Sequence, residues 1–414
     1  MREVVLFTRN VLSHLDQTEE EKLQRIKSLD RIINTVGFHL RYIERGAVRN
    51  TPWSMIQCLE DFFRTATGVP SRFLVRPIWS YNYQIVPNFT NAYREFIKGE
   101  ADDVKEVDSL FGKFREEVFI VSFPRLERLN TTLHCLLGHE MGHTLSKEWL
   151  DQNKDDQDEL RKRKPVNPVD AWTIFQCGLD ELVADLVGSH LLGLGAVFAS
   201  YEWAIKRNLD SAPSAPDYHP PWRFRIRNML DSLAEDVDFL RQEKLSFAFP
   251  QDAAKDENPT CQKAIADWLQ QIREEADKRT DWEVIEKNLP DGKIIYEAIQ
   301  DAVPRIRHWI ETQRLPELKY SLRSSADRIP DLVDKLRRHI PPSEYGVWPT
   351  TRAADLRDIL TASWFYKLHR LASCEDEKLS DLKAQSVADL LTLKAIESSH
   401  VRIVFQNQLA ENSA

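Results

Sequence analysis

Long hydrophobic runs are absent from this 414-residue chain. Its mean hydropathy is −0.46, and no uncharged run reaches the roughly 20 apolar residues that a membrane-spanning helix needs. The most apolar stretch, residues 186–199, is interrupted by serine, histidine and glycine. We therefore expect a buried core helix there and no membrane span.

Cysteine is also scarce. The five cysteines are widely spaced, odd in number and nowhere paired as CxxC: Cys58, Cys135, Cys177, Cys261 and Cys374. Such thiols are typical of a reducing compartment rather than of a disulfide framework. Residues 1–7 are soon followed by Arg9 and His14, so the apolar region of a signal peptide does not form. Both features predict a cytoplasmic protein.

The chain also has no excess of positive charge. Lys and Arg number 56 against 65 Asp and Glu, which gives a net charge of −9, and the isoelectric point is near 5.8. This balance disfavours general binding to nucleic acid or to anionic membranes. The one basic run, residues 161–164, lies in the polar segment 151–167. We expect that segment to be a solvated insertion, disordered rather than a mobile lid over a cleft.

The most informative feature that is present is the HExxH motif at residues 139–143, in an apolar segment typical of a helix. Residues four apart lie on one helix face, so His139 and His143 can bind the same metal ion. Glu140 lies beside the first ligand, where it can take a proton from a metal-bound water. Gly142, between the ligands, leaves room for another element to pack closely. These residues predict zinc-dependent hydrolysis of an amide bond.

Catalytic zinc needs a third protein ligand and keeps one position for water. Residues 178–185 read Gly-Leu-Asp-Glu-Leu-Val-Ala-Asp, and in a helix Glu181 and Asp185 share a face with apolar flanks. Buried carboxylates need a metal or another cation as partner. We therefore predict that Glu181 is the third ligand and that Asp185 orients a ligand histidine through its other ring nitrogen. The alternative is an amphipathic helix whose acids face solvent.

HExxH followed by a helical Glu-x-x-Ala-Asp resembles the gluzincin clan of metallopeptidases. A third segment, residues 219–226, reads His-Pro-Pro-Trp-Arg-Phe-Arg-Ile. It is similar to the His-Pro-Pro-x-x-x-Arg-Ile segment of the prenyl-protein (CAAX-type) and stress-induced membrane zinc endopeptidases. This resemblance, which covers residues 118–226, implies that His219 and Arg225 stabilise the oxyanion. Those peptidases are embedded in a membrane, whereas this chain has no comparable spans.

Periodicity predicts an α+β, mostly α protein. Residues 118–123 are β-branched and aromatic and end at Pro124, which predicts a strand, and two more strands are expected within 71–87. An extended substrate would pair with strand 118–123 by β-addition. Helices are expected at residues 19–36, 51–67, 261–277, 292–313, 326–339, 351–371 and 381–406. The predicted regions are an N-terminal helical region (1–70), a zincin-like catalytic core (71–245) and a C-terminal helical domain (246–414).

The sequence thus predicts a zinc-dependent endopeptidase that hydrolyses peptide bonds by a metal-activated water and acts on a restricted protein substrate. Two other classes stay open. One is a non-catalytic helical scaffold with a structural zinc site, closed by Cys177 or His190, that binds a partner protein through the C-terminal helical domain. The other is a metallohydrolase of a different small amide, with a cleft too narrow for an extended chain.

Overall fold

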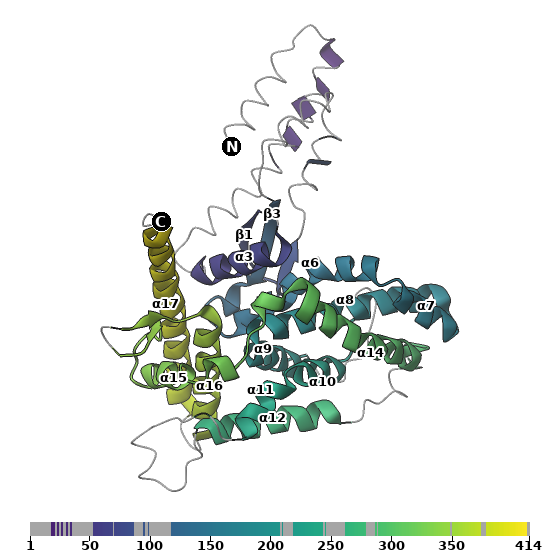
Figure 1. Cartoon of the computed structure of the whole chain (residues 1–414). Coiled ribbons are helices and arrows are strands. Elements are labelled where there is room, and N and C mark those ends of the chain that lie inside the picture. Colours follow the sequence, from purple (N-terminus) through teal and green to yellow (C-terminus); the bar gives the residue numbers. More distant parts are fainter. Residues whose placement is uncertain are drawn as a thin grey trace. The chain divides into compact units, whose positions relative to one another are not determined.

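The computed structural model of the chain is drawn in Figure 1. It describes residues 53–86 except 69, 94–95, 98, 117–209 except 208, 218–242, 245, 261–278, 286–287, 289–347, 350–373 and 378–411, with scattered positions between 18 and 34. Two compact units make up the chain. Unit 1 comprises residues 1–51 and 60–128, and unit 2 comprises residues 52–59 and 129–414.

Unit 1 contains a three-stranded sheet formed by β1 (Ser71–Ile78), β2 (Gln84–Val86) and β3 (Glu117–Pro124). The strand order is β1-β3-β2, with β1 parallel and β2 antiparallel to β3. Helix α3 (Trp53–Thr67) places Phe63 against this sheet, with ring centroids 5.5 Å from Phe73 and 4.5 Å from Phe119. The small sheet and the helix near residues 51–67 are therefore as predicted, although Thr51 lies outside the described residues.

We expected an extended substrate to pair with strand 118–123. This is wrong at Ile120–Ser122, where β3 is already paired on both sides. β1 bonds along one edge from Glu117 to Pro124, and β2 occupies the other edge at Ile120–Ser122. On the outer edge of β1, the Phe73 backbone N–H donates a hydrogen bond to the Glu60 carboxylate at 3.0 Å. An added strand would find no open edge on β3 at these residues.

Unit 2 is built mainly from helices, which follow in chain order. They are α6 (Leu136–Gln152), α7 (Asp155–Lys162), α8 (Pro168–Leu192), α9 (Leu194–Ile205), α10 (Trp222–Ser232), α11 (Ala234–Arg241), α12 (Cys261–Asp277), α14 (Gly292–Trp309), α15 (Ile329–Arg337), α16 (Leu356–Ser373) and α17 (Lys378–Glu411). A short two-stranded sheet joins β4 (Glu344–Tyr345) to β5 (Arg352–Ala353). The helix predicted at 261–277 coincides with α12, and α14 to α17 overlap the four helices predicted beyond it. The division into three regions at 70 and 245 stays a prediction.

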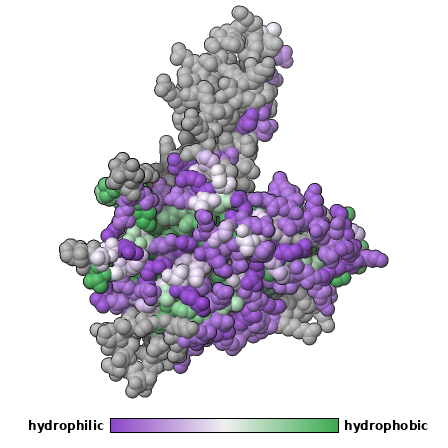
Figure 2. Space-filling view, in the orientation of Figure 1, coloured by the Kyte–Doolittle hydropathy of each residue, from purple (hydrophilic) through white to green (hydrophobic). Residues whose placement is uncertain are grey.

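The predicted buried core helix near 186–199 is present as two helices. The second half of α8 and most of α9 are buried, and Gly193 separates them with a positive φ of 57°. A side chain at Gly193 would meet the Tyr320 ring at 2.5 Å, so glycine is needed there for two reasons. Within the described residues, no helix combines the length and apolar character needed to cross a bilayer. Most of the residues that Figure 2 colours by hydropathy are hydrophilic on the face drawn there.

The polar insertion at 151–167 is not disordered, which corrects our prediction. Its centre forms α7, and Leu160 of that helix is buried. Arg163 forms ion pairs with Asp301 and Glu297 of α14. The Asp291 carboxylate accepts a hydrogen bond from the Val166 backbone N–H at 2.6 Å. These contacts with residues more than a hundred positions away hold the segment, and no local sequence pattern reveals them.

Helices α6 and α8 lie side by side in Figure 1 and approach very closely. A Cβ at Gly142 would lie 2.4 Å from the Ala184 Cα, and one at Gly188 would lie 3.0 Å from the His139 backbone nitrogen. Both contacts are with backbone atoms, so only glycine permits this separation. The expectation that Gly142 admits a close neighbour is confirmed. This packing brings the two predicted ligand-bearing helices face to face.

Candidate metal centre

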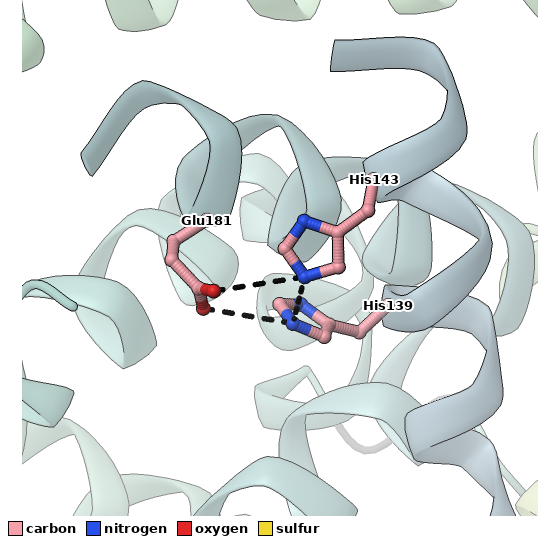
Figure 3. A group of neighbouring side chains, drawn as sticks. All are labelled: His139, His143 and Glu181. Atoms are coloured by element: carbon pink, nitrogen blue, oxygen red, sulfur yellow. Dashed lines mark hydrogen bonds and ion pairs between the residues drawn. The ribbon is translucent and has the colours of Figure 1, made fainter. Parts of the chain in front are cut away.

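His139 and His143 of α6 and Glu181 of α8 point toward one another, as Figure 3 shows. The two Nε2 atoms are 3.1 Å apart. His139 Nε2 lies 3.6 Å from Glu181 Oε2, and His143 Nε2 lies 3.6 Å from Glu181 Oε1. Ligands at about 2.0–2.1 Å from a tetrahedral zinc ion would be roughly 3.3 Å from one another. The observed separations fall on both sides of that value, so these three residues could hold a metal ion.

Each histidine has its own carboxylate on the other ring nitrogen. His139 Nδ1 is 2.8 Å from Asp185 Oδ1, and His143 Nδ1 is 3.0 Å from Asp180 Oδ2. When Nδ1 carries the proton and donates it to a carboxylate, Nε2 keeps its lone pair. The two Nε2 lone pairs then face each other, and either a shared proton or a metal ion between them relieves their repulsion. This arrangement fits a metal ion on the basis of the protein's own donor atoms.

The charges around the cluster also favour a cation. Burial opposes the charged form of His143, but the Asp180 carboxylate beside Nδ1 and the charges of Glu181 and Glu140 raise its pKa to about 9. Burial likewise opposes ionisation of Asp185, yet Arg225 and His139 hold its pKa well below the usual range. A metal ion therefore meets ionised carboxylates and has to displace a proton from the imidazoles.

Arg225, at the start of α10, is buried beneath this cluster. Its Nε and Nη2 atoms donate to the two Asp185 oxygens at 2.7 and 2.8 Å, and Nη1 lies 2.7 Å from Glu181 Oε2. The guanidinium also stacks on the Trp222 ring at 4.0 Å. Arg225 is therefore no surface residue. Because its donors are directed at Glu181 and Asp185, the contacts favour a role in holding these carboxylates over the predicted contact with an oxyanion.

His219 and Glu140 lie at the accessible side of the cluster. His219 Nε2 is 3.4 Å from Glu181 Oε1, and its side chain is 49% exposed. The preceding residue, Tyr218, has a φ of 46°, in the left-handed region that costs energy for a tyrosine. Glu140 is partly buried next to His139, and its charge acts on both His143 and Arg225. The structure thus brings together every site residue that the sequence predicted.

Two residues considered as extra ligands are not part of the donor group. His190 directs Nε2 at the Leu315 carbonyl oxygen, 2.7 Å away, and Cys177 is not among the donors that lie within 4.8 Å of one another. Sequence reasoning missed Asp180, which is held by the Ser146 hydroxyl and His143. Its place directly before Glu181 is the only signal, because an acid there can reach the second histidine once α6 and α8 are adjacent.

No protein-family model, curated protein or solved structure matches this chain. The resemblance to gluzincins therefore stays a hypothesis that rests on three short motifs. The conclusion that His139, His143 and Glu181 could hold a metal ion rests on their geometry.

Proposed function

We propose that this protein is a metal-dependent hydrolase, specifically a zinc endopeptidase that cleaves peptide bonds. The observation that carries the proposal is the convergence of His139, His143 and Glu181, with a carboxylate behind each histidine. Two imidazoles and one carboxylate are the donor set of catalytic zinc sites that retain a position for water. The identity of the metal follows from this chemistry and is part of the proposal.

A bound zinc ion supplies Lewis acidity at the site and makes water acidic near neutral pH. Glu140 takes the proton from the water that attacks the peptide carbonyl and passes it to the leaving amine. His219, half-exposed beside Glu181, donates a hydrogen bond to the carbonyl oxygen as that oxygen becomes negative. Arg225 keeps Glu181 and Asp185 ionised and in place. Each role is taken by a residue whose position fits it.

The substrate we propose is a restricted set of proteins. A peptidase in the cytoplasm, where the spacing of the cysteines suggests this chain resides, has to avoid indiscriminate cleavage. The test compares new protein N-termini in cells that carry the wild type or Glu140→Gln. A short set of N-termini present only with the wild type supports the proposal, and identical sets refute it.

A second candidate is a scaffold with a structural zinc site. His219 Nε2 is close enough to Glu181, at 3.4 Å, to become a fourth ligand after a small movement. The end of α17 also exposes apolar side chains that a partner protein could cover, namely Val401, Phe405 and Leu409. The absorption spectrum of the Co²⁺-substituted protein separates the two candidates. A spectrum that changes on adding a small competing anion indicates an open position, whereas an unchanged spectrum indicates a closed, four-ligand site.

A further inference from the structure

A partly open pocket, lined by both apolar and charged side chains, lies in unit 2 beside the C-terminal half of α8. Its volume is about 20 Å³, counted as space for the centre of a water molecule, which is enough for one or two waters or one monatomic ion. Its walls come from α8, α14, the turn that follows α14, the chain just beyond that turn, and Ser232 and Leu233 at the end of α10. The lining residues used in the argument below are Leu186, His190, Arg307, Glu311, Lys319 and Tyr320.

The charge of this lining is positive. Glu311 forms an ion pair with Lys319, with Oε1 and Nζ 3.1 Å apart, so these two charges offset each other. Arg307 has no ion pair or side-chain hydrogen bond with any residue that the structure describes. Burial lowers the pKa of His190, so its imidazole stays neutral at pH 7. Among the described residues, the Arg307 guanidinium therefore has no ion-pair partner, and it lines a partly buried, partly open pocket.

The backbone around the cavity is unusual and well anchored. Residues Ile310–Arg314 form a π-helical turn, a conformation that is rare and often found at functional sites. The His190 carbonyl accepts a hydrogen bond from the Tyr320 backbone N–H at 2.9 Å, and the Tyr320 ring packs on Gly193. The walls are thus fixed before any ligand arrives, which reduces the entropy that binding would cost.

We infer that this cavity is a binding site for a monovalent anion of the size of chloride, held between Arg307 and Lys319. A guanidinium and an ammonium supply charge-assisted donors. The bound anion neutralises the surplus charge and links α14 to Lys319, whose neighbour Tyr320 is hydrogen-bonded to the His190 carbonyl near the end of α8. The site is independent of the proposed peptidase activity.

The experiment uses the full chain and bromide, which replaces chloride and scatters anomalously. Crystals soaked in bromide are expected to show an anomalous peak between Arg307 and Lys319. In solution, the melting temperature of the wild type is expected to rise saturably when chloride replaces gluconate at constant ionic strength. The variant Arg307→Gln should bind chloride about tenfold or more weakly. Arg305→Gln, which removes an exposed charge from the same helix, should respond like the wild type.

The melting temperature in gluconate alone checks that both variants fold. An equal chloride response in wild type and Arg307→Gln overturns the inference. So does density in the cavity that has no anomalous signal and refines as water. Neither outcome depends on whether the His139–His143–Glu181 cluster binds metal or catalyses hydrolysis.

Discussion

Replacing Gly142 by alanine tests how the close approach of α6 and α8 builds the metal centre. The new Cβ would lie 2.4 Å from the Ala184 Cα and 2.8 Å from the Ala184 carbonyl oxygen. Carbon atoms in contact are normally about 3.5–4.0 Å apart, so the two helices must separate by roughly 1 Å at this point. Both contacts are with backbone, so neither a new rotamer nor Ala184→Gly can relieve them.

A separation of that size exceeds the tolerance of a metal site, where ligand distances hold within about 0.2 Å. His143 lies one residue from Gly142 and faces Glu181 across the gap, at 3.6 Å. We expect Gly142→Ala to weaken metal binding by at least about tenfold and to lower the free energy of unfolding by about 1–3 kcal/mol. Competition with a chromophoric chelator measures the first quantity, and urea denaturation of the metal-free protein measures the second.

Gly195→Ala is the matched control, because its Cβ would meet the Cys135 sulfur at 3.3 Å and the edge of the Trp364 ring at 3.6 Å. These side-chain atoms can shift by a few tenths of an ångström. The control should therefore bind metal as the wild type does. Metal affinity of Gly142→Ala within about twofold of the wild type would refute the reasoning, since each 1.4 kcal/mol corresponds to a factor of ten.

Three further predictions concern single side chains. Asp180→Asn should weaken metal binding about tenfold, because the His143 Nδ1 loses its anionic partner at 3.0 Å, and unchanged affinity in the chelator assay would contradict this. His219→Ala should lower kcat by about 10²–10³ with little change in KM or zinc content if it contacts the oxyanion. Burial raises the pKa of Asp236 to about 6, above its value in the unfolded chain. The stability that the neutral carboxyl contributes is therefore complete below about pH 4 and is lost as the pH rises through 6. Asp236→Asn should therefore be more stable than the wild type by about 3 kcal/mol at pH 7.5 and equal to it near pH 4. Equal stability at both pH values in urea titrations would contradict the assignment.

The residues of the candidate metal centre could be predicted because local periodicity places them. His139 and His143, like Glu181 and Asp185, are four apart on regular helices, so each pair shares a face whatever the rest of the chain does. Glycine at 142 marked the point where another helix could approach. The structure also shows how the histidine pair on α6 and the acidic pair on α8 come together, through the contact between Gly142 and Ala184.

The order of the strands could not be predicted in the same way. The central position of β3 depends on which segments pair along its two edges, and periodicity gives no information about that. That the segment around α7 is folded and not disordered similarly depends on distant contacts. Arg163 pairs with Asp301, and the Asp291 carboxylate accepts a hydrogen bond from the Val166 backbone N–H. Asp180 was missed because its partner, the second histidine, is determined by how α6 and α8 cross.

The metal content of the purified protein tests the central claim most directly. Elemental analysis should find about one zinc ion per chain in the wild type and in Glu140→Gln, since Glu140 is no ligand. His139→Ala and His143→Ala should contain almost none, because each removes one of three donors. Wild-type protein without near-stoichiometric metal, or metal retained equally by the histidine variants, would contradict the account.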